Sequence, residues 1–423
     1  MSLIEDLDAE VIVVGGSVSG VHVAKTLSEK GVDVLVLDKA EFPRPKSCAG
    51  GITRKALVQF PYVKEFIDTN IYTWVIMSPN LDEGVTFHSD DLDKPLTGIT
   101  LNRTDFDNKM INHLMSTTNC KVKMKTEVVD VEIKDDRAIV HAKDGKRYLS
   151  LVVIGADSTI STVSKSLGIG LFDPKLKSKR RELLSVSIEK EILFDNSEKA
   201  KKNELEVLSI NSYEGLDGYV WYFPRSIGAN VGVIAGDGKN QKKVLEKFIH
   251  YLIEIGKIPK NTRIVDKFNG ALLPGKILYK KRIHDRVLLV GDAGGFCYPG
   301  TGEGIFPCLV SGELAGEVIA PLIKKYRLNK ERNGISNGLF SKKNLKKYVK
   351  LTDTAMKNEF RLFRIAYKIM ANRRFNVELI KWCQNDEKLT QNIYKSLFGE
   401  KTSISFQLLI LSKYIKFKLK RKR

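Results

Sequence analysis

A short run of glycines near the N-terminus has the spacing of a dinucleotide-binding turn. Gly15 and Gly16 are followed by Gly20, with Ser17 where the usual motif has its middle glycine and with Ser19 inside the loop. Such a loop needs glycine for a tight turn, for close approach of the backbone to a pyrophosphate, and for packing of a helix on a strand. The amides at the start of the next helix then face the phosphates, and serine is small enough to preserve that approach. The alternative is an ordinary strand-to-helix turn in which glycine serves packing alone.

An acidic residue follows at the distance that this motif requires. A β-branched strand is predicted over 11–14, a helix over 21–30, and a second buried strand over 32–37 that ends at Asp38. Strand, glycine turn, helix, strand and acid within about thirty residues form the context in which the motif binds dinucleotides. Asp38 is therefore predicted to accept hydrogen bonds from the ribose hydroxyls of an adenosine.

A second glycine-rich loop follows another predicted buried strand, over 286–290. This strand leads to Asp292, and the loop passes Gly302 and Gly304 before a helix that is predicted to begin at Ile305. Because α/β folds place ligands at the carboxyl ends of strands, Asp292 is predicted to accept hydrogen bonds from ribityl hydroxyls. The helix start favours negative charge, such as that of a reduced flavin. The alternative is a glycine-rich surface loop.

Three aromatic residues alternate along one predicted strand over 218–223. Strand alternation directs Tyr219, Trp221 and Phe223 to the same face. They form either an apolar wall that faces lipid or flavin, or a face packed in the core. Pro224 immediately after them, and the lack of another strong aromatic cluster, favour the wall.

The two glycine motifs, in this order and at this separation, resemble the FAD-binding folds of the aromatic hydroxylase and glutathione-reductase class. Within that class the chain is similar to the geranylgeranyl reductase family. Four further segments carry this narrower match: the loop Pro45–Gly51, the segment Arg103–Asp107, the strand Gly218–Pro224, and Gly302–Ile305. The resemblance covers about residues 8–325. Besides Ser17, one departure is Ala156-Asp157-Ser158, where the class usually has Ala-Asp-Gly, and it bears on the pyrophosphate geometry.

The resemblance implies one bound FAD and a reductase that saturates C=C bonds of geranylgeranyl chains, most simply in membrane ether-lipid precursors. The glycine motifs contribute Gly15, Ser17, Gly20 and Gly302 to the FAD site, and the resemblance adds Ser19, Asp38, Cys48, Ala49, Gly51, Arg103, Val128, Asp292, Gly304 and Ile305. For Val128 and Cys48 the alternative is a simple role in the core. Cys297, in the second motif, is a weaker candidate for a place near the flavin ring.

The expected reaction assigns catalytic roles to three residues. Because no carbonyl polarises an isolated alkene, we expect a proton to add to one carbon and a hydride to the other. Cys48 and Tyr219 are candidate proton donors, and Trp221 is a candidate to stabilise positive charge. Tyr219, Trp221 and Phe223 are the predicted substrate contacts. No separate NAD(P)H-binding unit is recognisable, so the expected electron donor is transiently bound NAD(P)H or a ferredoxin.

Two other functions remain open at this point. One is a flavin-dependent monooxygenase or halogenase on the same fold, although the Trp-x-Trp-x-Ile-Pro pattern of halogenases is absent, with Tyr219 and Phe223 at its first and last hydrophobic positions. The other is a non-catalytic lipid-binding protein that retains FAD.

The predicted fold is α/β, with three parts. A Rossmann-type FAD-binding domain is expected over 1–58, 99–182 and 271–330, and an antiparallel-sheet substrate domain over 59–98 and 183–270. A basic helical region follows over 331–423. Strand patterning is seen over 74–89, a helix is predicted over 105–115, three strand-like runs lie in 128–154, and four strands lie in 183–234.

Composition and charge narrow the surroundings in which the chain works. The formal net charge is +20, which indicates an anionic partner or simply a lysine-rich proteome. The five cysteines are scattered, which argues against disulfides and against a metal site. No nucleic-acid module is recognisable, no signal peptide is seen before residue 11, and no apolar run approaches the roughly 20 residues of a membrane span. A reducing, intracellular compartment is expected.

The C-terminal tail favours a lipid substrate. A predicted helix carries one apolar face and is flanked by basic residues: Ile404, Leu408, Leu411, Ile415 and Leu419, with Lys413, Lys416, Lys418 and 420–423. Such a helix suits an anionic membrane surface, so we expect a cytoplasmic protein that is peripheral at the inner face of the cell membrane. The alternative is a packed helix with a frayed basic end.

Overall fold

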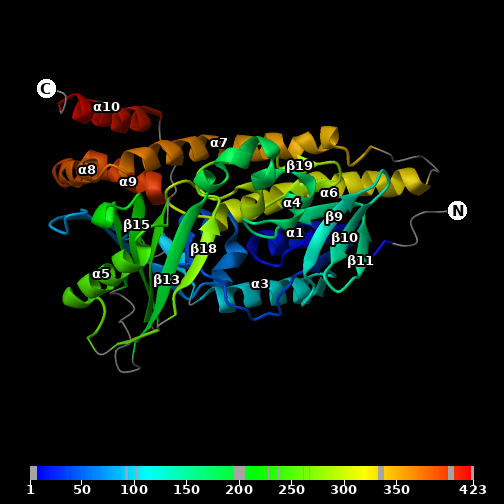
Figure 1. Cartoon of the computed structure of the whole chain (residues 1–423), viewed down its shortest axis with the longest axis horizontal. Helices are drawn as coiled ribbons and strands as arrows, with labels where there is room; N and C mark the ends of the chain where they lie inside the picture. The colour runs from blue at the N-terminus through cyan, green and yellow to red at the C-terminus, as the bar shows by residue number, and fades with distance from the viewer. Residues whose placement is uncertain are drawn as a thin grey trace. The chain divides into compact units, whose positions relative to one another are not determined.

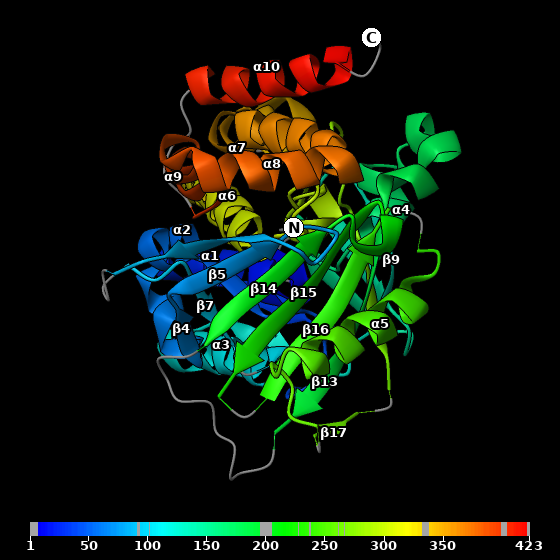
Figure 2. The ribbon, with the colours of Figure 1, turned by 90° about the vertical axis from the view of Figure 1, so that its left-hand side faces the viewer.

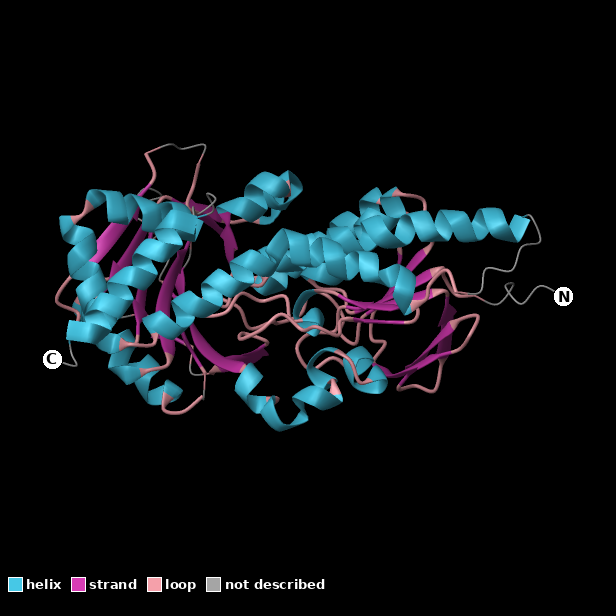
Figure 3. Cartoon of the chain, turned by 90° about the horizontal axis from the view of Figure 1, so that it is seen from above, coloured by secondary structure: helices cyan, strands magenta, loops and turns pink. Residues whose placement is uncertain are grey.

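The computed structural model describes residues 7–90, 94–100, 102–194, 205–226, 228–236, 238–260, 262–265, 267–331, 338–398 and 404–420. The chain divides into two compact units, and each combines strands with helices (Figure 3). Unit 1 comprises Met1–Pro45, Thr104–Leu184 and Leu273–Arg361. Unit 2 comprises Lys46–Arg103, Ser185–Leu272 and Leu362–Arg423.

A sheet that is parallel except at one edge forms the centre of unit 1. Its order is β19 (Ile283–His284), β20 (Val287–Leu289), β12 (Val152–Gly155), β1 (Val11–Val14), β2 (Val34–Leu37) and β8 (Lys121–Lys123), with β19 antiparallel. Strands β1, β2, β12 and β20 are buried throughout, as is usual when helices cover both faces of a parallel sheet. Because these four strands run the same way, the motifs that follow them meet at one edge of the sheet. The predicted Rossmann-type fold is confirmed.

Two long helices of unit 1, α1 (Val18–Glu29) and α6 (Ile305–Glu331), lie side by side (Figure 1). A Cβ atom added to Gly312 would lie 3.0 Å from the carbonyl oxygen of Ser19, and one added to Gly316 would lie 2.6 Å from Cγ2 of Thr26. Glycine is therefore needed where the two backbones approach. Helix α6 is long and apolar enough to cross a bilayer, contrary to the expectation from sequence, but 67% of its most apolar stretch is buried inside the fold. This burial is typical of a core helix.

A second, antiparallel sheet of unit 1 consists of β9 (Val128–Ile133), β10 (Ala138–Ala142) and β11 (Arg147–Ser150). The three strand-like runs expected over 128–154 are thus four strands. The last run divides at Leu151, because the residues before it pair with β10 and those after it pair with β1. Helices α3 (Arg103–Thr117, from its second residue) and α4 (Thr162–Leu167) complete this unit up to the C-terminal helices.

A large sheet forms the body of unit 2. Its order is β17 (Arg263–Ile264), β13 (Ser185–Leu193), β16 (Gly228–Ala235), β15 (Gly218–Arg225), β14 (Glu206–Asn211), β5 (Thr73–Met77) and β6 (Gly84–His88), with β18 (Asn269–Leu273) beside β13. Its strands are antiparallel, as predicted, except that β14 and β5 run parallel. Helix α5 (Gln241–Glu254) covers one face (Figure 2), where Phe248 and Leu252 pack on Val220, Tyr222 and Val231.

The structure divides the chain differently from the predicted domain boundaries. A small sheet of β3 (Gly51–Thr53), β7 (Thr97–Ile99) and β4 (Thr69–Ile71), with helix α2 (Arg54–Gln59), belongs to unit 2. Because β3 pairs with β7, residues 46–58 and 99–103 join unit 2 rather than the segments around the glycine motifs.

The C-terminal helices also do not form a region of their own. Helix α7 (Lys342–Met370) belongs to unit 1 up to Arg361 and to unit 2 from Leu362. Helices α8 (Arg373–Asn385), α9 (Glu387–Phe398) and α10 (Ile404–Lys420) follow in unit 2 (Figure 2). Their aromatic core brings the ring of Phe375 within 5.0 Å of Tyr414 and 5.5 Å of Phe417, measured between ring centroids.

Candidate FAD site and substrate face

The first glycine loop is packed so tightly that two of its glycines cannot carry a side chain. Gly15 has a φ of +103°, and a Cβ atom there would lie 2.4 Å from the carbonyl oxygen of Ala156. A Cβ atom on Gly20 would lie 1.8 Å from the carbonyl oxygen of Gly15. The turn between β1 and α1 therefore has the close backbone approach that the motif predicts.

Asp38 ends β2 and holds the same loop. One of its carboxylate oxygens accepts a hydrogen bond from the backbone N–H of Gly16 at 2.7 Å, and the other accepts one from Ala40 at 2.8 Å. The carboxylate is buried, so these donors offset the loss of water. Asp38 thus lies directly against the glycine loop, at the position where a ribose-binding acid is expected.

Ser17, which replaces the middle glycine of the motif, binds a residue of another predicted segment. Its hydroxyl donates to Oδ2 of Asp107 at 3.0 Å, and Arg44 Nη2 lies 3.2 Å from the same oxygen. Its side chain does not cap α1, and the first turn of that helix contains no acidic residue. The positive end of the α1 dipole is therefore not neutralised from within the helix.

The other departure from the family pattern also has a structural account. Asp157 accepts hydrogen bonds from the N–H groups of Thr162 at 2.6 Å and Val163 at 3.2 Å, at the start of α4. Burial raises the pKa of this carboxyl group, and these hydrogen bonds oppose the shift. Ser158 has a φ of +71°, a conformation that favours glycine, which explains why the class usually has glycine there.

The second glycine loop meets the first. A Cβ atom on Gly291, which has a φ of +56°, would lie 2.5 Å from the hydroxyl oxygen of Ser19. Asp292 lies in the short helical turn Gly291–Gly294, and a Cβ atom on Gly304 would be 3.6 Å from its Oδ1. The structure therefore brings Ser19, Asp292, Gly304 and the start of α6 together.

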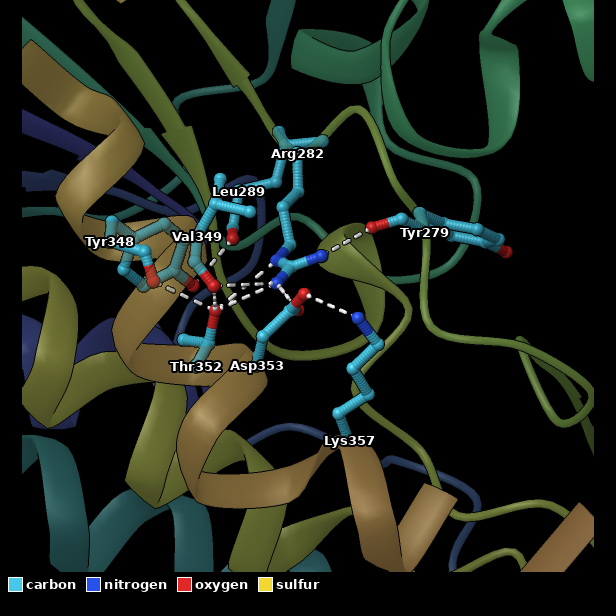
Figure 4. A network of polar contacts seen from close by, with 8 residues as sticks. All are labelled: Tyr279, Arg282, Leu289, Tyr348, Val349, Thr352, Asp353 and Lys357. Atoms are coloured by element: carbon cyan, nitrogen blue, oxygen red, sulfur yellow. Dashed lines mark hydrogen bonds and ion pairs between the residues drawn. The ribbon is translucent and has the colours of Figure 1, made fainter. Parts of the chain in front are cut away.

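A buried polar network anchors α7 beside this loop (Figure 4). The guanidinium of Arg282 donates to the carbonyl oxygen of Tyr279 at 2.7 Å and to Oγ1 of Thr352 at 2.9 Å, and it forms an ion pair with Asp353. The hydroxyl of Tyr348 donates to the carbonyl oxygen of Leu289 at 2.8 Å. Since Leu289 ends β20, this network fixes the strand that leads to Asp292.

These features fit a dinucleotide of the FAD type. The α1 terminus has backbone amides for phosphates, and acidic residues end β2 and follow β20 at the same edge of the sheet. The first turn of α6 also contains no acidic residue. Val128, the predicted adenine contact, is buried in the same core cluster as Val14 and Leu37, whose strands lead to Gly15 and Asp38.

The predicted aromatic face lies in unit 2, on the side of the sheet opposite α5. Val220 and Tyr222 pack on α5, so Tyr219, Trp221 and Phe223 point the other way. The rings of Tyr219 and Trp221 lie 5.8 Å apart, and those of Phe223 and Trp74 lie 5.6 Å apart, between centroids. Trp221 and Phe223 are buried, whereas Tyr219 is partly exposed. We call these four residues the aromatic wall.

The loop with Cys48 lies against the same face. A Cβ atom on Gly51 would lie 2.7 Å from Cε2 of Phe223, and the carbonyl oxygen of Ala49 accepts from Arg225 at 3.4 Å. The N–H of Cys48 donates to Oε1 of Glu189 at 2.9 Å. The predicted residues Cys48, Ala49 and Gly51 thus lie beside the predicted substrate residues.

Sequence reasoning missed the acidic residues of this face. Glu189 is 3% exposed, and burial raises the pKa of its carboxyl group; repulsion from Glu191 adds to the shift, while Ser47, the Cys48 amide and Arg225 oppose it. Glu191 instead pairs with Arg225 at 2.6 Å and accepts from Asn230 at 2.9 Å. In a strand reading Ser-Val-Ser-Ile-Glu-Lys-Glu, the polar positions look solvent-facing, so only the fold reveals that they are buried.

Comparison with known proteins identifies the family. The family described as FAD binding domain matches residues 8–305. The chain is 29% identical over 367 residues to digeranylgeranylglycerophospholipid reductase 2 of Methanosphaera stadtmanae, covering 85% of this chain and 87% of the relative. It is 31% identical over 320 residues to the digeranylgeranylglycerophospholipid reductase of Methanosarcina mazei, covering 73% and 74%. The chain belongs to the geranylgeranyl reductase family of FAD-dependent oxidoreductases.

Solved structures agree at the level of the fold. A geranylgeranyl bacteriochlorophyll reductase-like protein from Thermoplasma acidophilum matches with a TM-score of 0.77 at 19% identity, covering 96% of each chain. The halogenase PltM in complex with FAD matches with a TM-score of 0.66 at 14% identity, covering 98% of this chain and 92% of PltM. Identities this low relate the reductase to these proteins through the fold alone.

Within the reductase, the remaining predicted residues have these positions. Arg103 is buried at the first residue of α3, and Cys297 is fully buried behind the Asp292 turn. Gly302 has a φ of +68°, in the loop before α6, and Ile305 is the first residue of that helix. The contacts predicted between these residues and FAD remain predictions.

Proposed function

We propose that this protein saturates C=C bonds in the geranylgeranyl chains of membrane ether-lipid precursors. The observation that carries the proposal is the aromatic wall with the Cys48 loop beside it on one sheet face, in a chain whose relatives are named as reductases of a digeranylgeranyl glycerophospholipid. A run of aromatic rings is suited to a long, unsaturated hydrocarbon that offers no polar group for recognition.

The aromatic wall supplies more than apolar surface. Protonation of an isolated alkene leaves positive charge on the neighbouring carbon, and the face of an indole or phenol ring attracts that charge. Such a cation–π contact stabilises it by about 0.5–2 kcal/mol per ring. When bound, reduced FAD supplies the hydride. Trp221 is held for this role by its Nε1–H, which donates to Oδ1 of Asn230 at 2.7 Å.

Cys48 and Tyr219 remain the proposed groups near the reacting carbons. The Sγ atom of Cys48 accepts from the N–H of Gly50 at 3.4 Å, and Tyr219 is the least buried ring of β15 on this face. We expect Cys48→Ala to slow reduction of the alkene while the protein still binds FAD. Unchanged turnover would remove Cys48 from the mechanism.

Helix α10 supports a membrane surface as the place of work. Ile410, Tyr414 and Phe417 pack on the core of unit 2, whereas Leu408, Leu411, Ile415 and Leu419 are 59%, 38%, 49% and 58% exposed. The helix therefore presents a second apolar face, flanked by Lys416. The side chains of Ile404, Lys418 and 420–423 lie outside the described residues. Together these features suit peripheral binding at the anionic inner face of the cell membrane.

The electron donor belongs to the proposal as well. Either transiently bound NAD(P)H or a ferredoxin is compatible with a chain of net charge +20, since both carry negative charge. Mixing each donor with the oxidised protein without oxygen, and following flavin absorbance, distinguishes them.

An anaerobic turnover experiment tests the function directly. The purified protein is reduced with dithionite, a geranylgeranylated glycerophospholipid is added, and flavin absorbance and product mass are followed. Reoxidation of the flavin with a gain of two mass units per double bond supports the proposal. A flavin that stays reduced until air is admitted would instead indicate an oxygen-using enzyme.

A sedimentation assay with vesicles tests the membrane surface separately. Wild-type protein is expected to bind vesicles of anionic phospholipid and to bind neutral ones weakly. Leu411→Glu with Ile415→Glu should abolish binding. The matched control is Ile365→Glu on α7, because Ile365 is equally exposed at 47% but lies outside α10. Equal loss in both variants would argue against a role for α10.

A further inference from the structure

The buried polar row on the face of the aromatic wall is not absorbed by the roles given so far. In register across β13, β16 and β15, Glu189 stands opposite Gly232, and Gly232 stands opposite Trp221. A Cβ atom on Gly232 would lie 2.2 Å from Cζ2 of Trp221, so the indole lies over this glycine. The missing side chain at 232 therefore lets the Trp221 ring extend toward the strand that carries Glu189.

The two acids of this row have different surroundings. Glu191 has a guanidinium partner, because Arg225 Nη1 lies 2.6 Å from its Oε2. Glu189 accepts instead from a neutral donor, the backbone N–H of Cys48, at 2.9 Å. An acid that is buried beside a paired acid, with a neutral donor of its own, favours the protonated state. Pairs of carboxyl groups held in such different states mark acid and base roles in enzymes.

We propose that Glu189 is the acid that supplies the proton for alkene reduction, and that its hydrogen bond also sets the position of the Cys48 loop. This proposal rests on the proposed function. The groups that face Glu189 are Ser47 and Cys48 from the loop, Glu191 on its own strand, and Arg225 on β15. Burial raises the pKa of the Glu189 carboxyl group, in keeping with a group that carries its proton at neutral pH.

The step balances with water as the source of protons. The O–H bond of Glu189 breaks and a C–H bond forms at one alkene carbon, either directly or with the Cys48 thiol passing the proton on. The hydride that comes from reduced FAD adds to the other carbon with both electrons, so the alkene is reduced by two electrons and the flavin is oxidised by two. The Glu189 carboxylate then recovers its proton from water.

Glu189→Gln is the decisive variant. Glutamine keeps an oxygen that accepts from the Cys48 N–H, so the loop is retained, but it has no acidic proton. In anaerobic single turnovers with saturating geranylgeranylated glycerophospholipid, we expect alkene-dependent reoxidation to fall about 100-fold or more. FAD content, reduction by dithionite and lipid affinity should stay unchanged, and Glu189→Asp should recover part of the rate. The control is Glu206→Gln on β14, a surface acid paired with Lys257, which should stay within about twofold of wild type.

A second measurement does not depend on turnover. Infrared spectra of the oxidised protein at pH 7 should contain the C=O band of a protonated carboxyl group that shifts in D2O and is absent from Glu189→Gln. If the wild type is not reoxidised by the lipid, the proposed function fails. If the wild type turns over and Glu189→Gln stays within about threefold of it, or the band is missing, Glu189 is not the acid. The band keeps the test valid even where the variant is unstable.

Discussion

The hydroxyl of Ser17 donates a hydrogen bond to Oδ2 of Asp107 at 3.0 Å. Ser17 belongs to the first glycine loop and Asp107 to helix α3, and the side chain of Asp107 is fully buried. The residue that departs from the glycine pattern is therefore used to tie the phosphate-binding turn to a helix 90 residues further along the chain. A glycine at position 17 would be the more usual choice but would leave this carboxylate with fewer donors.

We predict that Ser17→Ala lowers the free energy of unfolding by about 1–3 kcal/mol, because a buried carboxylate loses a donor. Urea denaturation of the FAD-free and FAD-loaded protein measures this, and fluorescence titration gives the FAD affinity, which should also fall. Ser116→Ala, at an exposed site on α3, is the control and should change stability little. Equal effects of the two substitutions would show that the bond to Asp107 contributes nothing.

We predict that Gly232→Ala impairs the substrate face without affecting FAD. The new methyl group would overlap the Trp221 ring, which must then turn away. Tryptophan fluorescence should shift, and alkene reduction should slow about tenfold or more, with normal FAD content. Gly270→Ala on the neighbouring strand β18 is the control, since that glycine is exposed. Normal turnover in Gly232→Ala would contradict the role given to Trp221.

We predict that Arg282→Met destabilises unit 1 by about 3 kcal/mol or more. Arg282 is 2% exposed, and its removal leaves buried acceptors on β20 and α7 unpaired (Figure 4). Asp353→Asn should cost less, because the Asp353 side chain is 31% exposed and water can replace its partner. Hydrogen exchange of α7 checks the prediction, and a larger effect from Asp353→Asn than from Arg282→Met would refute it.

We predict that acid weakens the protein through His22. Burial, together with Lys25, lowers the pKa of His22 from 6.5 to about 3. The unfolded chain then binds a proton below pH 6.5 that the folded chain does not, so stability is complete above pH 6.5 and falls toward pH 3. Between pH 6.5 and 5 the loss is about 2 kcal/mol. His22→Gln should flatten this slope in urea titrations, whereas His250→Gln, at an exposed site on α5, should leave it unchanged.

The parts of the fold that local pattern determines were predictable. The strand over 11–14 is confirmed at its exact bounds, and the helix predicted to start at 305 does so. Helix α1 begins at Val18 rather than at 21, because the glycine loop itself enters the helix. The division at Leu151 was not predictable, since hydrophobic periodicity does not say which sheet a strand joins.

The site divides in the same way. Asp38 and Asp292 follow buried strands, so their position at the sheet edge could be inferred from sequence. The bond between Ser17 and Asp107 and the burial of Glu189 depend on residues far away in the chain, such as Cys48 and Arg225. A polar residue in a strand carries no local sign that distinguishes solvent from a buried network.

The close seam between α1 and α6 has a consequence for how the protein is made. Val23 and Gly312 meet across that seam, so helix α1 leaves the ribosome long before its partner is synthesised. Strands β1 and β12 likewise wait for β20 before the parallel sheet is complete. Until then an apolar stripe of α1 stays uncovered, and contacts of such long sequence separation form slowly. A nascent chain that stops before α6 should therefore need a chaperone, whereas a chain that has passed residue 331 should not.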